Sequence, residues 1–299
     1  MSLYKEKLIK AYSVDELVKK GIKYIQKSGE RIWTTSGLAL QSNNVTYVLE
    51  NSLNRIHTLR APTSIKYFAR ELFAYFVGSL KVDEGLSDAS KFWNKIADEN
   101  GMINSNYGYY VFKKQTPSGK SQLQWVRENI IENPDTRQAV ININGIEHKK
   151  ATKDFPCTLG LVFHLDGNTL NLDVSSRSTD VITGLPYDIG FFSFVLELLV
   201  ALLSRDLGKN IDVGYTAMHA FFTQIYDRTE NKIPEILENE PDCYLQQMPR
   251  IIDAEATLGD IIKINEGTPK TDIIKWVVKN KDYETISCVL RYDYYEENH

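Results

Sequence analysis

The sequence predicts one α+β domain, with a strand-rich middle and helices packed on it, and three patterns carry this prediction. Two runs of alternating apolar residues on either side of Asp166-Gly167 predict a hairpin. A long apolar segment at residues 190–204 predicts a buried helix, and residues 64–77 have the three- and four-residue apolar spacing of an amphipathic helix. Such a mixture is typical of the α+β class. No repeat or low-complexity tract divides the chain, so we expect a single domain over residues 1–299.

The elements of the N-terminal half follow from the same patterns. Residues 4–28 predict one or two helices. The amphipathic helix at residues 64–77 should stop at Gly78, because glycine is the usual residue beyond a helix C-terminus. Residues 87–100 predict another helix, and residues 116–120, which combine proline and glycine, predict an exposed loop.

The hairpin is the strongest local signal, because Asp-Gly is strongly favoured in two-residue turns. A loop at Asp166-Gly167 would pair Leu165 with Asn168 and place the apolar residues of both strands on one face. When this register is extended to the start of the first strand, Cys157 lies opposite Ser176, which is next to Arg177. The sequence therefore predicts that a cysteine and an arginine lie side by side.

The C-terminal half is predicted to contain strands at residues 211–219 and 284–291 and a loop at residues 265–271. The apolar run Ile189–Ser204 contains Glu197 and is shorter than the roughly 18–20 residues that a membrane span needs. We therefore expect a buried helix there and no membrane association.

Composition excludes several classes of function. Lys and Arg number 35 against 39 Asp and Glu, a net charge of −4, so the chain has no overall electrostatic reason to bind nucleic acid or an anionic membrane. The three cysteines, Cys157, Cys243 and Cys288, are far apart and in no paired spacing. That argues against a disulfide framework and a metal site, and for a cytoplasmic protein. No N-terminal signal pattern is visible.

General catalytic motifs do not identify the chemistry. The sequence has no P-loop, no dinucleotide glycine fingerprint, no Cys-x-x-Cys pair and no His-Glu-x-x-His. Taken alone, Cys157 at a strand start is more often an inert small hydrophobe. Asp188 could be a helix N-cap, and His219 a core histidine. Patterns alone therefore stop at an α+β domain with one suggestive cysteine.

Several segments between about residues 60 and 225, in order and with matching spacing, resemble the core of the thymidylate synthase family. They are Arg70-Glu71-Leu72, residues 97–101, Asn106-Tyr107-Gly108, residues 133–137, Pro156-Cys157, residues 176–181 and residues 184–189. The resemblance implies one domain with a large mixed sheet, a homodimer packed sheet to sheet, and 5,10-methylenetetrahydrofolate as co-substrate without a metal. Cys157 would attack carbon 6 of a pyrimidine nucleotide, and carbon 5 would then accept the one-carbon unit. Water addition would give a hydroxymethyl product, and hydride transfer from the folate a methyl product.

One residue indicates the branch of the family. Thymidylate synthases have Asn where this chain has Asp188, whereas the phage deoxycytidylate hydroxymethylases have Asp. An amide complements the N3–H and O4 of uracil, but against cytosine it must mispair or flip. A carboxyl group can accept from the cytosine amino group and share a proton with N3. Residues 103–105 and Thr158 also resemble the hydroxymethylase. The resemblance therefore implies that the product is 5-hydroxymethyl-dCMP, released with tetrahydrofolate.

Other roles carry over from the family. The catalytic residues would be Cys157, Glu71, Asp188 and Tyr107. The phosphate would be bound by Arg177, Ser178, Arg137 reaching across the dimer, and Arg31 from a poorly kept N-terminal loop. His219 would contact the sugar hydroxyl. The folate would be held by Asp180, Trp93, Tyr187 and Gly184.

Departures from the family pattern leave alternatives open. Gln138 replaces a second phosphate arginine, and Ile96 replaces a folate-side tryptophan. Phe221 replaces a sugar-binding tyrosine, which keeps CMP open as the substrate. Residues 292–299 differ from the short apolar tail of the synthases, and a less sealed site would favour water over hydride transfer. A dCMP methyltransferase is a second alternative, and a catalytically inactive nucleotide-binding homologue is a third.

Overall fold

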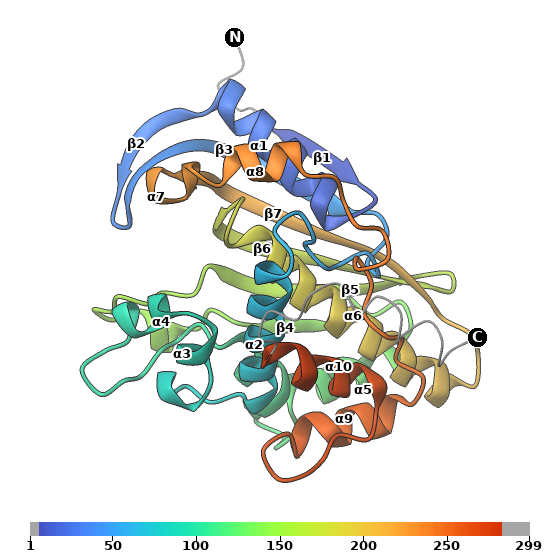
Figure 1. Ribbon diagram of the computed structural model, residues 1–299. Coiled ribbons are helices and arrows are strands. Elements are labelled where there is room, and N and C mark those ends of the chain that lie inside the picture. Colours follow the sequence, from blue (N-terminus) through green and yellow to red (C-terminus); the bar gives the residue numbers. More distant parts are fainter. Residues whose placement is uncertain (1–5, 283–299) are drawn as a thin grey trace.

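The computed structural model describes residues 6–282. The strand predicted at residues 284–291, Cys288 and the C-terminal residues 292–299 lie outside the described residues. Within them, strands and helices form a mixed structure built on one large sheet (Figure 1). The α+β class and the large mixed sheet are therefore confirmed.

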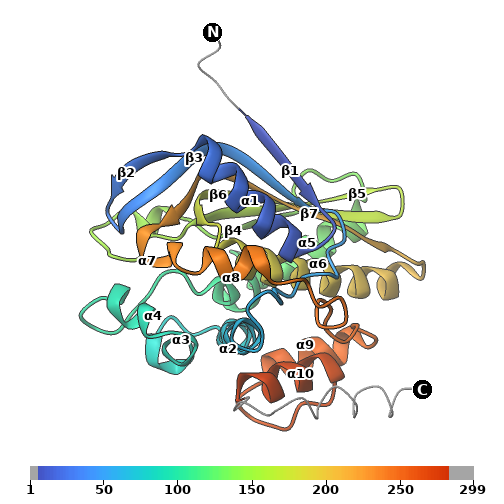
Figure 2. The ribbon, with the colours of Figure 1, turned by 45° about the horizontal axis from the view of Figure 1, so that its top comes forward.

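The sheet has seven strands in the order β1-β3-β7-β6-β5-β4, with β2 paired to β3. β1 runs parallel to β3, and β6 parallel to β7, while the other pairs are antiparallel. The strands are β1 Lys7–Ala11, β2 Glu30–Thr34, β3 Gly37–Leu49, β4 Val140–Asn142, β5 Thr158–Asp166, β6 Thr169–Asp180 and β7 Asp212–Tyr226. The helices gather on one side of this sheet (Figure 2).

The helices surround one long apolar helix, α6 Leu185–Leu207, which packs against β6 and β7. The others are α1 Val14–Ser28, α2 Thr63–Val77, α3 Leu86–Ala89, α4 Lys91–Ile96, α5 Gln122–Glu132, α7 Asp227–Glu230, α8 Ile233–Glu238, α9 Ala254–Ile262 and α10 Asp272–Lys281. By length and composition α6 could cross a membrane, but 83% of its most apolar stretch is buried inside the protein. It packs as the core helix that the sequence predicts.

One helix prediction is confirmed closely and two need correction. α2 ends at Gly78, which adopts a left-handed φ of 62°. Residues 7–11 form β1 rather than helix, because Ile9 and Ala11 turn inward when the segment pairs with β3. The helix predicted at residues 87–100 is two short helices, because Ser90 leaves helical geometry and its side chain caps α4.

The hairpin forms, but its register differs from the prediction by two residues. Asp166 pairs with Thr169, so the loop is Gly167-Asn168 rather than Asp166-Gly167. Gly167 takes a φ of 59° at the first loop position, where glycine is favoured in a type II′ turn. Because side chains alternate with a period of two, this shift keeps the same apolar residues on the core face.

A bulge changes the prediction for the start of the hairpin. The register shifts between Thr158 and Gly160, so Ser176 lies opposite Thr158 rather than Cys157. The carbonyl oxygen of Cys157 instead accepts a hydrogen bond from the backbone N–H of Arg177, at 2.8 Å. The predicted proximity of the cysteine and the arginine is therefore confirmed, in a corrected register.

A buried ion pair crosses the apolar core at Glu197 of α6. Its Oε2 lies 2.5 Å from Nη2 of Arg55, and the two side chains are 3% and 1% exposed. Oε1 lies 2.9 Å from Nε of Arg250, whose side chain is 57% exposed. Burial raises the pKa of Glu197, but the charge of Arg55 and the other contacts outweigh it and hold the pKa below its usual value.

We expect Glu197→Gln to lower the free energy of unfolding by about 3–5 kcal/mol, because it leaves the Arg55 guanidinium buried without a counter-ion. The matched control is Arg250→Gln, which breaks the half-exposed pair with the same carboxylate and should cost at most about 1 kcal/mol. Urea unfolding of both variants measures the difference. Equal losses of unfolding free energy in the two variants would show that the burial of Arg55 does not determine the cost of removing the Glu197 charge.

Candidate active site

The site is built where β5 begins and β6 ends. Cys157 immediately precedes β5, and its Sγ lies 3.7 Å from Oγ of Ser178 on β6. Because Arg177 and Ser178 are neighbours on β6, the bulged hairpin brings both beside the thiol. The structure thus places these three predicted residues together.

The guanidinium of Arg177 is tied to the segment that carries the thiol. Its Nη2 donates to the carbonyl oxygen of Phe155 at 2.6 Å, and its Nε donates to that of Pro156 at 3.1 Å. Its Nη1 lies 3.3 Å from Oγ of Ser178. Burial raises the pKa of the Cys157 thiol, and the charge of Arg177 opposes that rise. Arg177, together with the hydrogen bond from Ser178, thus favours the thiolate.

Two carboxyl groups from different helices lie near each other. Glu71 of α2 is 4% exposed, and burial together with the charge of Asp188 raises its pKa to about 8. Asp188 lies in the first turn of α6, and burial raises its pKa to about 7. Both carboxyl groups can therefore gain or lose a proton near neutral pH, as general acids and bases must.

Asp188 is not the helix cap, because Gly184 holds that position and accepts the backbone N–H of Asp188 at 3.0 Å. Among residues 6–282, no group forms a recorded hydrogen bond with the carboxyl group of Asp188. A desolvated carboxyl group with open hydrogen-bonding positions is suited to contact a ligand.

Tyrosines line the space around these acids. Tyr107 is buried, and its pKa is raised by burial and further by the charges of Asp188 and Cys157, so it lies close to both. Its ring packs on Phe192 of α6, with centroids 5.5 Å apart. The structure therefore brings the four predicted catalytic residues into one neighbourhood.

Two tyrosines beside Glu71 were missed by the sequence analysis. The hydroxyl of Tyr67 donates to Oε1 of Glu71 at 2.8 Å. Tyr75 is also buried, and the charge of Glu71 raises its pKa further than burial alone. Both lie four residues from Glu71 along α2, a spacing that puts side chains on one helix face and was readable in the sequence.

Three of the four residues predicted to hold folate, Asp180, Gly184 and Tyr187, lie around the start of α6. Oδ1 of Asp180 accepts the backbone N–H of Ile182 at 2.8 Å, and Oδ2 accepts the hydroxyl of Thr183 at 2.9 Å. This carboxylate therefore shapes the turn into α6. The backbone passes close to Gly184, where a Cβ would lie 3.1 Å from the backbone oxygen of Asp180. Tyr187 of α6 packs on Tyr67, with ring centroids 4.4 Å apart.

Trp93 lies on α4, apart from that turn. Its side chain is buried, and its indole Nε1–H has no hydrogen-bond partner within the described part of the chain. A buried donor without an acceptor is costly, and a ligand acceptor would satisfy it.

Three predicted substrate-binding residues lie outside the cluster. Arg31 of β2 pairs with Asp227 at 2.9 Å and with Glu230 at 3.6 Å on the surface. Arg137 is exposed in the loop before β4. His219 of β7 lies 2.8 Å from Asp173 through its Nε2, and this contact raises its pKa.

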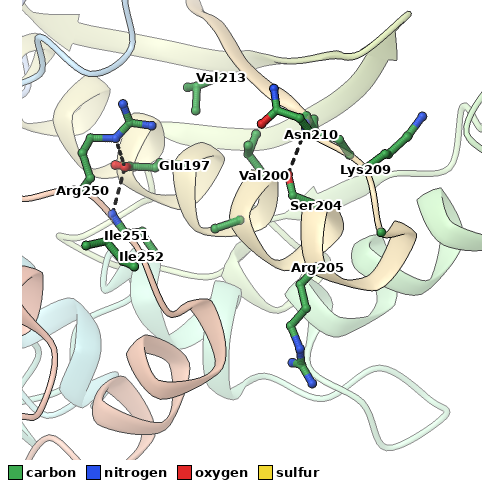
Figure 3. A pocket seen from close by; sticks show the side chains of 13 residues that line it. Glu197, Val200, Ser204, Arg205, Lys209, Asn210, Val213, Arg250, Ile251 and Ile252 are labelled. Carbon is green, nitrogen blue, oxygen red and sulfur yellow. Dashed lines mark hydrogen bonds and ion pairs between the residues drawn. The ribbon is translucent and has the colours of Figure 1, made fainter.

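A cavity of about 530 Å³ lies elsewhere in the described residues. It lies between the C-terminal half of α6, residues 208–213 and residues 250–252, and contains none of the predicted site residues (Figure 3). Its polar groups largely pair with one another, as Glu197 does with Arg250 and with the backbone N–H of Ile251. No group of three or more metal-ligating side chains occurs in residues 6–282. We therefore place the candidate active site at Cys157, on the geometry of its side chains.

A cysteine beside an arginine, with two desolvated carboxyl groups and a buried tyrosine, has the chemical groups that covalent catalysis by a thiolate with acid–base assistance requires. Comparison with known proteins gives the family. The sequence model of the thymidylate synthase family matches residues 12–265, and the chain belongs to that family.

Individual relatives carry two activities. The chain is 28% identical over 169 residues to the deoxycytidylate 5-hydroxymethyltransferase of Enterobacteria phage T4, covering 54% of this chain and 68% of that protein. It is 23% identical over 218 residues to the thymidylate synthase of Haloferax volcanii, covering 64% of this chain and 63% of that protein. It is also 26% identical over 205 residues to the thymidylate synthase of Buchnera aphidicola, covering 67% and 75%. The chain thus spans less than two thirds of the Haloferax enzyme.

Proposed function

We propose that the protein is a deoxycytidylate 5-hydroxymethyltransferase, which transfers a one-carbon unit from 5,10-methylenetetrahydrofolate to carbon 5 of dCMP. The observation that carries the proposal is Asp188, a desolvated carboxyl group with a pKa of about 7 and open hydrogen-bonding positions beside Cys157. A carboxyl group can accept from the amino group of cytosine and give a proton to N3.

The thiolate of Cys157 would bond to carbon 6 of the ring, and the electron pair displaced by that addition makes carbon 5 nucleophilic. Because the same addition pushes negative charge towards N3, a proton donated there by Asp188 stabilises the adduct. Arg177 supplies the positive charge that opposes protonation of the thiol. Carbon 5 would then bond to the methylene carbon of the folate, and loss of the carbon 5 proton with cleavage of the bond from that carbon to the folate nitrogen would leave an exocyclic methylene. Addition of water to this methylene, followed by loss of the thiolate from carbon 6, would restore the aromatic ring.

Folate would serve as the one-carbon donor and leave as tetrahydrofolate. Tyr187 and Trp93 are aromatic side chains that could border its ring, and the unpartnered Nε1–H of Trp93 offers it a donor. Glu71, with a pKa of about 8, would take a proton from the water that adds to the methylene.

A homodimer fits the same proposal. The sheet surface away from the helices carries exposed apolar side chains, including Val162 of β5 and Phe221 of β7. A second copy packed there would cover them. Arg137, exposed and without a recorded ion pair in the described residues, would then reach the phosphate in the partner's site.

The test is mass spectrometry of the products after incubation with 5,10-methylenetetrahydrofolate and an equal mixture of dCMP, CMP and dUMP. We expect the mass of one formaldehyde unit to be added to dCMP. The same gain on CMP would support the ribonucleotide alternative, which the absence of a hydroxyl at Phe221 keeps open. A methylene gain on a cytosine nucleotide would indicate a methyltransferase, and on dUMP a thymidylate synthase. No product from any of the three would favour an inactive nucleotide-binding homologue.

A further inference from the structure

We propose that Tyr67 is a positioning residue for Glu71: its hydroxyl holds Oε1 of the carboxyl group and leaves Oε2 as the oxygen that handles the reacting water. The inference rests on the proposed function, in which Glu71 takes a proton from that water. It adds a residue that neither the family resemblance nor the sequence patterns identified.

The contact is fixed from two sides. Tyr67 and Glu71 are four residues apart on α2, so their side chains lie on the same face of the helix. The Tyr67 hydroxyl donates to Oε1 at 2.8 Å. The ring of Tyr67 packs against Tyr187 of α6, with centroids 4.4 Å apart and planes at 58°. A hydroxyl held between two helices in this way can fix the rotamer of the carboxyl group it contacts.

The two oxygens of Glu71 are therefore not equivalent. Oε2 is buried and has no hydrogen-bond partner among the residues that the structure describes. Burying a carboxylate oxygen without a donor is costly, and such atoms in folded proteins usually have a functional reason or a bound water. With Oε1 engaged by Tyr67, Oε2 is the oxygen left without a donor, and a water molecule brought in with the substrate would supply one.

The hydrogen bond also sets the titration of Glu71. Burial raises the pKa of this carboxyl group most, and the charge of Asp188 of α6 raises it further. The hydroxyl of Tyr67, which forms the hydrogen bond to Oε1, lowers the pKa, and the nearby Tyr75 of α2 lowers it less. Tyr187 is also near enough for its own pKa to be raised by the charge of Glu71. A donor to the ionised form favours that form, so removing the Tyr67 hydroxyl should raise the pKa of Glu71.

The test is an infrared pH titration of the full-length protein without substrate. The spectrum of Glu71→Gln, subtracted from that of the parent, isolates the carboxyl signal of Glu71 and gives its midpoint. For Tyr67→Phe, the spectrum of the Tyr67→Phe/Glu71→Gln double variant is subtracted in the same way. We expect the midpoint of Glu71 in Tyr67→Phe to lie about one pH unit above that of the parent. The matched control is Tyr109→Phe, because Tyr109 is a half-buried tyrosine whose hydroxyl makes no recorded hydrogen bond in the described chain. Its midpoint should stay at the parent value.

Turnover supplies the second measurement. In the plot of kcat against pH, the limb set by the ionisation of Glu71 should shift to higher pH in Tyr67→Phe, by the same amount as the infrared midpoint. The Kd for dCMP should change less than twofold. An unmoved midpoint in folded Tyr67→Phe would overturn the inference. A moved midpoint in a protein that turns over no pyrimidine nucleotide would overturn the proposed function and support the pairing alone. If Tyr67→Phe does not fold, Glu71→Asp withdraws the carboxyl group from the same hydroxyl, and a midpoint no higher than that of the parent would count against the inference.

Discussion

Replacing Cys157 by alanine should reduce turnover of dCMP by on the order of 10⁴–10⁶-fold, because the covalent step has no substitute nucleophile. Among the described residues the other free cysteine is Cys243, which is exposed and not part of the site. Binding of dCMP should persist within a few-fold, since the phosphate contacts expected from Arg177 do not involve the sulfur. Single-turnover kinetics and calorimetric titration of the nucleotide measure the two effects separately.

Cys243→Ala is the matched control and should keep the parent rate, because it removes the same chemical group from a site outside the cluster. A Cys157→Ala protein that retained one per cent of the parent turnover would contradict nucleophilic catalysis by this residue. Loss of both turnover and binding would instead assign Cys157 a structural role. Arg177 donates to the carbonyl oxygens of the two residues before Cys157, so a distortion of that segment would also displace Arg177.

Much of the fold could be predicted because its largest elements have strong local patterns. α2 and α6 carry apolar residues at the spacing that their packing requires, and the hairpin has a turn dipeptide between alternating strands. The helix prediction at residues 7–11 was wrong because five residues are too few for their pattern of charged and apolar side chains to separate strand from helix. Pairing with β3, far away in the sequence, decides it.

The site was predictable as a set of residues but not as a set of contacts. The pair of Cys157 and Arg177 followed from hairpin register, yet the bulge that places them depends on tertiary packing of the strand. The ion pair of Arg31 with Asp227 joins residues almost two hundred positions apart, and no local sequence pattern predicts it. Tyr67 lay within reach of a sequence argument, since helical spacing alone puts it beside Glu71.

Replacing Asp188 by asparagine should shift the ratio of kcat/KM for dCMP over dUMP towards dUMP by at least about 30-fold. The carboxyl group, with a pKa of about 7, can give a proton to N3 as thiolate addition drives charge there, and an amide cannot. With uracil the charge collects on O4 instead, where an amide N–H can donate. One unmatched buried polar group costs about 1–3 kcal/mol, so losing the match with cytosine and gaining one with uracil supports a change of that size.

The control for that exchange is Glu71→Gln, which also replaces a carboxyl group with a raised pKa by an amide but should slow both nucleotides without changing their ratio. The comparison matters because the charge of Asp188 raises the pKa of Glu71, so a change at Asp188 could also lower activity in general through Glu71. Only Asp188 is expected to contact the edge of the base that distinguishes cytosine from uracil. If the cytosine preference survives in Asp188→Asn, the choice of base is made by another residue. The argument from Asp188 to dCMP would then be wrong, although the thiol chemistry at Cys157 would be unaffected.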